Sequence, residues 1–108
     1  MEFLVEFEIT VPRGIAEREV ERRESAEAAS AAALVEQGHL LRVWKLAARN
    51  GQGSVLGLYH ADSRAQLDGL LEALPLYEWM DIKITPLEPH PNDPNVREAA
   101  AVSGRSRR

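Results

Sequence analysis

Residues 39–60, HLLRVWKLAARNGQGSVLGLYH, contain the pattern that decides the fold. Residues 39–46 and 54–60 are both rich in leucine, valine and aromatic residues, which favour strands. Gly51 and Gly53 mark a turn between these two runs. The stretch therefore predicts a β-hairpin near the middle of the chain.

A helix is predicted on each side of this hairpin. Residues 15–37 contain no glycine or proline and are rich in alanine, glutamate and arginine, a composition that favours helix. Gly38 follows as a stop signal. After the hairpin, Asp62 or Ser63 can cap a second helix, which is expected to run to about Leu74 with leucines at helical spacing.

Two outer strands complete a βαββαβ order. Residues 2–10 largely alternate between apolar and acidic side chains, as a half-buried strand does. Ile82 and Ile84 mark a fourth strand, which Pro86 is expected to end. This order predicts an α+β, ferredoxin-like sandwich with a four-stranded antiparallel sheet and two helices on one face. The proline-rich segment 88–95 is expected to form an extended arm.

Composition and charge narrow the class of protein. The chain has 108 residues, of which 44% are hydrophobic, and no cysteine, so it fits one small domain without disulfides or thiolate sites. Residues 97–108 contain four arginines and one glutamate, so they carry +3 and leave −7 on the rest of a chain whose net charge is −4. We expect a domain over 1–94 and a flexible, arginine-containing tail over 95–108. A domain this acidic is a poor partner for nucleic acid.

Nothing in the sequence points to a membrane. No apolar run approaches the roughly 18 residues that a membrane span needs, and the N-terminus carries Glu2 and Glu6 where a signal peptide would be basic. We therefore expect a cytoplasmic protein with no membrane partner. The sheet face without helices would expose hydrophobic residues such as Leu4 or Trp44, so we also expect a homo-oligomer.

Glu27 is the first candidate for chemistry. Seven residues bring a helix back to within about 20° of the starting direction, so Glu27 shares a face with Val20 and Leu34 and is expected to turn toward the sheet. Burial there would raise the pKa of its carboxyl toward the range of a general base. The plainer alternative is a glutamate at the edge of that face whose carboxylate reaches water. Arg23, four residues earlier, is expected to pair with it on the helix surface.

Other residues fit supporting roles. Arg23 could anchor a substrate carboxylate, for which a guanidinium is well suited, and His39 could move protons near neutral pH. The aromatic residues could line an apolar pocket or plug one end of the core: Trp44, Tyr59, Tyr77 and Trp79. The spacing of the three histidines matches no metal-binding motif, so we expect no metal site.

An ordered series of short motifs resembles the muconolactone Δ-isomerase family. The matching pieces are residues 1–5 (MEFLV) with Pro12, Glu27 in the first helix, residues 38–45 (GHLLRVWK), residues 74–81 (LPLYEWMD), residues 85–87 (TPL) and the pair His90-Pro91. The third and fourth pieces resemble the family's Gly-x-Trp-x-x-Leu-Trp-Arg and Leu-Pro-Leu-Phe-Pro-Tyr-Met. The resemblance covers residues 1–94.

This resemblance implies a ferredoxin-like fold, homo-oligomers built on dimers with a decamer among the expected sizes, and no cofactor. It also implies a cofactor-free isomerase that moves the double bond of a small unsaturated lactone by proton transfer, in the bacterial degradation of aromatic compounds. On this hypothesis Glu27 is the base, His39 is a second proton carrier, and Arg23 or Arg42 anchors a carboxylate of the small-molecule substrate. The expected pocket wall is aromatic: Trp44, Tyr77 and Trp79.

The chain also departs from the family's pattern. Ala28 stands where the family commonly has lysine, and Val55 stands where it commonly has asparagine. Leu40 and Glu78 replace a tryptophan and a proline of the family's motifs. Two alternatives therefore stay open beside the lactone isomerase: a related isomerase or cyclase of a specialised biosynthetic pathway, and a non-catalytic oligomeric module that binds a small ligand.

Overall fold

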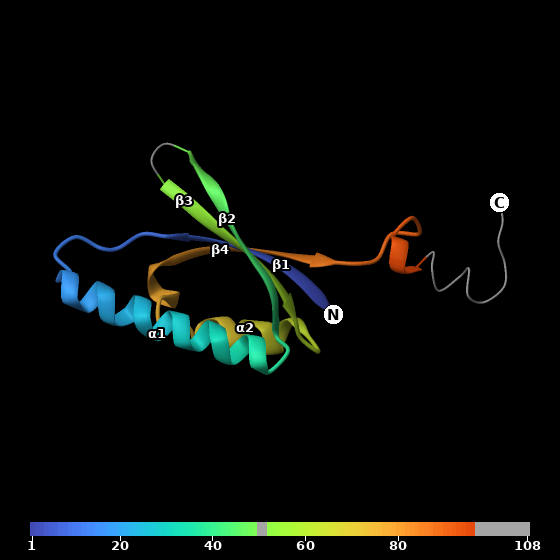
Figure 1. Ribbon diagram of the computed structural model, residues 1–108, viewed down its shortest axis with the longest axis horizontal. Helices are drawn as coiled ribbons and strands as arrows, with labels where there is room; N and C mark the ends of the chain where they lie inside the picture. Colours follow the sequence, from blue (N-terminus) through green and yellow to red (C-terminus); the bar gives the residue numbers. More distant parts are fainter. Residues whose placement is uncertain (50–51, 97–108) are drawn as a thin grey trace.

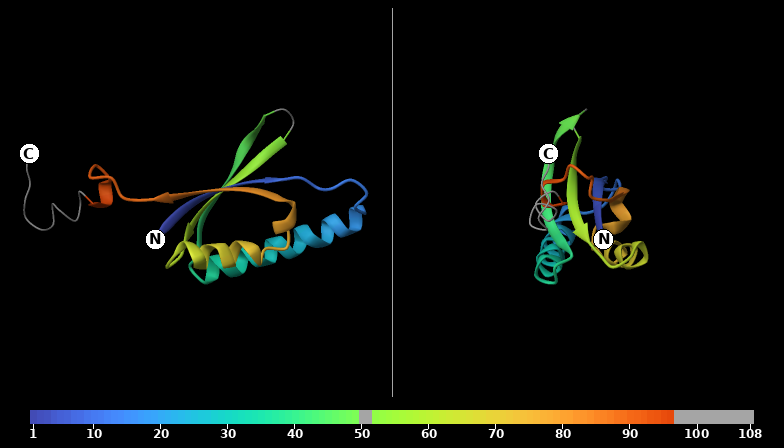
Figure 2. Two further views of the ribbon diagram at one scale, coloured as in Figure 1. Left: turned by 180° about the vertical axis from the view of Figure 1, so that it is seen from behind. Right: turned by 90° about the vertical axis from the view of Figure 1, so that its right-hand side faces the viewer.

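The predicted ferredoxin-like order is confirmed by a computed structural model, which describes residues 1–49 and 52–96. The elements are β1 (Glu2–Ile9), α1 (Glu17–Glu36), β2 (Leu40–Arg49), β3 (Gln52–His60), α2 (Arg64–Glu72), the short 3-10 helix η1 (Tyr77–Trp79) and β4 (Met80–Leu87). The strands form one antiparallel sheet in the order β2-β3-β1-β4. Both helices lie on the same face of this sheet (Figures 1 and 2).

The helix ends follow local signals in the sequence. Gly38, just after α1, has a φ of +82°, a conformation that glycine adopts without strain and that turns the chain toward β2. Of the two candidate caps for α2, Ser63 is used, because its side chain accepts a hydrogen bond from the backbone N–H of Gln66 at 3.0 Å. α2 ends at Glu72, slightly before the expected end. No helix in the described part of the chain is long and apolar enough to cross a membrane.

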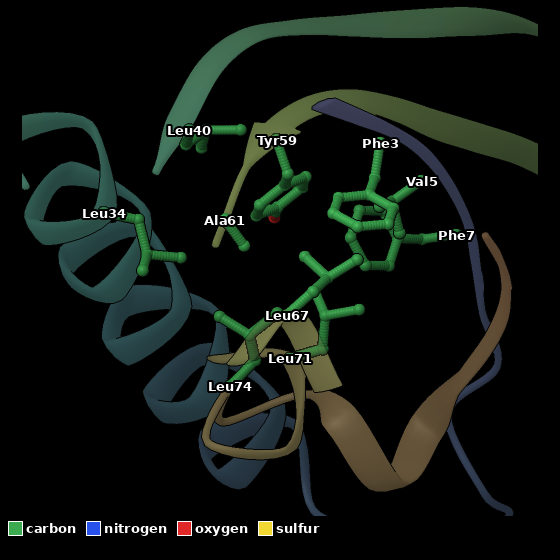
Figure 3. Packing of buried hydrophobic residues seen from close by; sticks show 10 residues of the cluster. All are labelled: Phe3, Val5, Phe7, Leu34, Leu40, Tyr59, Ala61, Leu67, Leu71 and Leu74. Atoms are coloured by element: carbon green, nitrogen blue, oxygen red, sulfur yellow. The ribbon is translucent and has the colours of Figure 1, made fainter. Parts of the chain in front are cut away.

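The core lies between the sheet and the helices (Figure 3). From β1, the alternating residues Phe3, Val5 and Phe7 face the helices and are buried. From α2, Leu67 and Leu71 pack against them. The remaining buried members of this cluster are Leu34, Leu40, Tyr59, Ala61 and Leu74. The longer helix contributes little to this packing, since Leu34 is its one buried residue.

Two expectations for the C-terminal part were wrong. β4 does not end at Pro86 but continues to Leu87. It is an edge strand, and an edge strand tolerates a proline because one of its two rows of N–H groups faces away from the sheet. The segment after β4 is not simply extended, because the N–H of Asp93 bonds to the carbonyl of His90 at 2.8 Å and closes a turn. The expected tail falls mostly on residues 97–108, which lie outside the described residues.

The second face of the sheet carries no helix in the described ranges (Figure 2). Strand register and alternation place five large apolar side chains there, each half-buried: Leu4, Trp44, Leu46, Leu56 and Leu58. On the same face, Glu6 of β1 lies directly opposite Lys83 of β4. This uncovered face is therefore mainly apolar over β2 and β3 and charged toward β4.

Candidate functional site

A cavity of about 290 Å³ lies between α1 and the sheet. Its lining consists of Phe7, Ile9, Glu24, Glu27, Ala28, Ala31, Leu40, Val43, Val55, Gly57, Tyr59, Leu76 and Met80. All of these side chains are apolar except those of Glu24, Glu27 and Tyr59. A mostly apolar hollow with a few polar groups is typical of a small-molecule site.

The cavity exists because short side chains face each other across it. α1 contributes Ala28 and Ala31, and β3 contributes Gly57. Further along the same layer, Leu34 and Leu67 fill the space between helices and sheet. The change from leucine to alanine and glycine along this layer therefore sets where the core ends and the cavity begins.

Gly57 is needed for the position of its neighbour. A Cβ at this residue would lie only 2.7 Å from Cε1 of Tyr59, far closer than two carbon atoms approach without repulsion. It would also lie 3.6 Å from Cδ1 of Leu40. The absence of a side chain at Gly57 thus lets the Tyr59 ring lie flat beside β3 at the wall of the cavity.

Glu27 lies on the face of α1 that turns toward the sheet, as its spacing predicted. Its Oε1 accepts a hydrogen bond from the backbone N–H of Leu76 at 3.1 Å. Burial among apolar side chains raises the pKa of the Glu27 carboxyl above its ordinary value, and the bond from Leu76 opposes this shift without cancelling it. The result is a carboxylate fixed through one oxygen and more basic than a glutamate in water.

Tyr59 brings a phenol to the same cavity. The residue is only 4% exposed, and its ring packs edge-on against Phe7 with ring centres 6.3 Å apart. Burial, together with the negative charge of Glu27, raises the pKa of Tyr59 to about 12. The phenol therefore stays protonated near neutral pH and can donate a hydrogen bond. Figure 3 shows its oxygen in the space between sheet and helices.

Arg23 lies at one end of this site and is not part of the cavity lining. Its Nη1 donates to the carbonyl of Pro75 at 3.3 Å and to the carboxylate of Glu78. Its guanidinium also lies over the ring of Trp79, 4.5 Å from the ring centre. These contacts fasten α1 to the segment that connects α2 with β4.

The expected surface pair of Arg23 with Glu27 was wrong. Arg23 pairs instead with Glu19, one turn toward the start of α1, at 3.0 Å. The physical reason is the inward direction of Glu27, whose carboxylate turns to the backbone of Leu76. The guanidinium of Arg23 therefore pairs with the more exposed carboxylates of Glu19 and Glu78.

The structure places Arg42 and Trp44 on the uncovered face of the sheet, away from the cavity of the same chain. Arg42 lies over the ring of Trp44 at 4.8 Å. A β-bulge between Leu40 and Arg42 is responsible, because the extra residue reverses the alternation of side chains along β2. Leu40 and Val43 consequently line the cavity in their place.

The other candidates lie near the ends of the site. Nδ1 of His39 is 2.9 Å from the carbonyl oxygen of His60, and His39 does not line the cavity. Tyr77 is 39% exposed on η1, while Trp79 is buried beneath Arg23. Of the predicted site residues, the structure therefore brings Glu27 alone to the cavity wall. In the described ranges, no three His, Asp or Glu side chains gather as a metal ion would require.

Sequence reasoning counted Tyr59 among the aromatic candidates but did not choose it as a site residue, and it did not place Glu24 in the lining. A usable signal existed for Tyr59, because Val55, Gly57 and Tyr59 alternate along one strand and therefore share a face. These three residues pair with Phe7, Val5 and Phe3 of β1, so they lie on the face of the sheet that the helices cover. The two positions singled out as departures from a family pattern, Ala28 and Val55, both line the cavity.

The family model and the curated relatives that match this chain belong to one family. A family model described as muconolactone delta-isomerase matches residues 1–93. Muconolactone Delta-isomerase 1 of Acinetobacter lwoffii is 29% identical over 92 residues, which cover 85% of this chain and 93% of that protein. Muconolactone Delta-isomerase of Rhodococcus opacus is 28% identical over 91 residues, with coverage of 84% and 95%.

Two solved structures share the fold. The crystal structure of a muconolactone isomerase matches with a TM-score of 0.75 and 24% identity, over 85% of this chain and 93% of that one. The 5-chloro-2-hydroxyhydroquinone dehydrochlorinase of Burkholderia phenoliruptrix matches with a TM-score of 0.61 and 16% identity, over 86% and 99%. Both confirm the ferredoxin-like architecture.

The close approach at Gly57 predicts the outcome of a glycine-to-alanine pair. Gly57→Ala should lower the free energy of unfolding by about 1–3 kcal/mol, because the added methyl overpacks the site against Tyr59. Gly69→Ala, in the interior of α2 with no atom near its added Cβ, should instead raise it by about 0.5–1 kcal/mol. Urea denaturation of both variants checks this. A Gly57→Ala protein as stable as Gly69→Ala would show that Tyr59 has room to move.

Proposed function

Because this chain belongs to the muconolactone delta-isomerase family, we propose that it isomerises a small unsaturated lactone of the muconolactone type during the breakdown of aromatic compounds. The observation that carries the proposal is that Glu27 and Tyr59 both line one apolar cavity. One is a carboxylate whose pKa burial has raised, and the other is a phenol that stays protonated. A proton shift next to a carbonyl needs one base and one donor of this kind.

In this reaction Glu27 moves the proton and Tyr59 stabilises the negative charge. The Glu27 carboxylate takes a proton from the ring carbon at one end of the allylic system, and the electron pair spreads onto the carbonyl oxygen. Tyr59 donates a hydrogen bond to that oxygen while it carries the negative charge. The protonated Glu27 then returns the proton to the carbon at the other end, so the double bond has moved and the enzyme is regenerated.

The surroundings of Glu27 suit this cycle. The bond from the Leu76 N–H holds Oε1 at a fixed position, so the carboxylate does not have to be oriented again for each proton transfer. Apolar neighbours such as Val55 and Met80 keep water from the lactone and from the enolate. The cycle needs no cofactor.

Replacing the proposed base tests the reaction. Glu27→Gln should lower kcat/KM for muconolactone by at least about 100-fold, the lower range for loss of a general base. Glutamine keeps an oxygen for the Leu76 N–H, so the fold should persist. The assay follows the ultraviolet change as the double bond moves. In the unmodified protein, kcat/KM should fall as the pH drops through the raised pKa of Glu27.

Glu21→Gln is the matched control, because Glu21 is an exposed carboxylate of the same helix outside the cavity. Its kcat/KM should stay close to that of the unmodified protein. Full activity of Glu27→Gln would remove this residue from the reaction.

The hydrogen-bond role of Tyr59 has its own test. Tyr59→Phe should keep the edge-on packing against Phe7 and yet lower kcat by about 100-fold or more, as removal of an oxyanion donor does. Tyr77→Phe, at an exposed phenol, should have no effect. Steady-state kinetics at pH 7 compares the two variants. An unchanged kcat in Tyr59→Phe would assign the stabilisation of the enolate to another group.

We also propose that the uncovered face of the sheet meets a second copy of the chain. The support is its set of half-buried leucines together with Trp44, which would otherwise stay in water. Sedimentation velocity should then find a dimer or larger oligomer, which Leu56→Glu should dissociate. Ala32→Glu, on the exposed side of α1, should leave the oligomer intact. A monomer at all concentrations would rule out this interface.

A further inference from the structure

The peptide bond between Pro75 and Leu76 is bound by α1 on both of its polar sides. Its carbonyl accepts a hydrogen bond from Nη1 of Arg23 at 3.3 Å, and its N–H donates to Oε1 of Glu27 at 3.1 Å. This peptide bond is trans, so its two polar groups point in opposite directions. Arg23 and Glu27 lie about one turn apart, roughly 6 Å along the helix axis. One peptide unit therefore bridges the two side chains, which make no direct ion pair.

The place of this peptide relative to α1 depends on few polar contacts. Within the described ranges, the hydrogen bonds between α1 and the connection from α2 to β4 all involve Arg23 or Glu27. The other bonds of the connection run elsewhere. The N–H of Trp79 bonds to the carbonyl of Leu76 at 2.9 Å, and the carbonyl of Trp79 accepts from Thr10 at 2.8 Å. These two bonds shape the connection and attach it to the end of β1, but they do not align it with Glu27.

The guanidinium of Arg23 is well fixed for such a role. It is held by Glu19 at 3.0 Å and lies over the ring of Trp79, 4.5 Å from the ring centre. The pair with Glu78 adds little, because that carboxylate is 67% exposed to water. A planar guanidinium can stack on an indole while its edge donates to the carbonyl of Pro75. The position of the carbonyl therefore follows the position of Arg23.

We propose that Arg23 is a positioning residue for Glu27 and acts through the peptide unit between Pro75 and Leu76. The inference rests on the proposed function only for the role of Glu27 as the base. By binding the carbonyl, the guanidinium fixes the plane of the peptide and keeps the N–H on Oε1. Its positive charge also polarises the peptide, which strengthens the N–H as a donor. The carboxylate is thereby held through one oxygen while the other faces the proton to be moved.

Loss of this contact has a defined effect on the acidity of Glu27. The bond from the Leu76 N–H favours the ionised carboxylate and opposes the rise in pKa that burial causes. A displaced N–H should therefore raise the pKa of Glu27 further. The other titratable groups that line the cavity are Glu24 of α1 and Tyr59 of β3, and the phenol stays neutral where carboxyl groups titrate. On the connection, the carboxylate of Glu78 is bound to the guanidinium.

Nuclear magnetic resonance of the deuterated protein tests the proposal without any substrate. In the unmodified protein, the amide resonance of Leu76 should move with pH as the bonded carboxylate of Glu27 titrates. Arg23→Met keeps a long apolar side chain beside Trp79 but removes the donors. This variant should reduce that movement at least about twofold and raise the pKa of the Glu27 carboxyl, because the N–H is no longer held on Oε1. An unchanged Leu76 amide and an unchanged Glu27 pKa would overturn the proposal.

Two further variants separate position from charge and from general damage to the helix. Arg22→Met is the matched control, because Arg22 bonds to the same Glu19 at 2.7 Å but to no residue of the connection. It should leave both resonance readouts unchanged, and an equal effect of both methionine variants would overturn the proposal. Arg23→Lys keeps the positive charge without the planar fork, so it should change both readouts in the same direction as Arg23→Met. Unmodified values in Arg23→Lys would assign the effect to charge alone and contradict the proposal.

Turnover distinguishes this inference from the proposed reaction. With muconolactone, Arg23→Met should lower kcat at least about tenfold with little change in KM, because a displaced base loses its alignment. The acid limb of kcat/KM should also move to higher pH with the pKa of Glu27. A raised KM with an unchanged kcat would make Arg23 a substrate anchor and overturn the positioning role. If the unmodified protein does not turn over muconolactone, the proposed reaction fails, while the resonance readouts still decide what Arg23 does to Glu27.

Discussion

The hydrogen bond from the backbone N–H of Leu76 to the carboxylate of Glu27 is the contact on which the site depends. It joins the middle of α1 to the connection between α2 and β4, two segments far apart in the sequence. Arg23, one turn earlier, adds bonds to the same connection. Together these bonds set the distance between α1 and the sheet, which the small alanine side chains of α1 would not determine by packing. The carboxylate proposed as the base thus also forms a structural hydrogen bond.

The same helix explains why a protein this small can keep a cavity. α1 is long but buries only Leu34 completely, since most of its inward positions are alanine or charged residues. The stability of the fold comes instead from β1 and α2, whose large apolar side chains meet in one cluster. The incompletely filled space therefore lies beside α1, the helix that contributes less to the core, and the main cluster stays well packed.

Most of the fold could be predicted from the sequence, and only part of the site. The element order follows from local signals such as Gly38 and the cap at Ser63, which act over a few residues. Glu27 could be placed because helical periodicity alone sets its direction. The face of Arg42 could not, and Trp44 was expected both on the uncovered face and in the pocket wall, because the bulge that sets their face depends on pairing between β2 and β3. Tyr59 required the register with β1 before its face was known.

The bulge between Leu40 and Arg42 also bears on how such chains can diverge. Loss of Leu41 would restore a regular ladder and leave Arg42 and Trp44 on the face they occupy now. Loss of Arg42 would instead invert the rest of β2, so the indole of Trp44 would enter the cavity while Val43 moved to the opposite surface. In evolutionary terms, a deletion at Leu41 leaves the two faces of β2 unchanged. A deletion at the next residue exchanges side chains between the lining of the site and the outer face of the sheet.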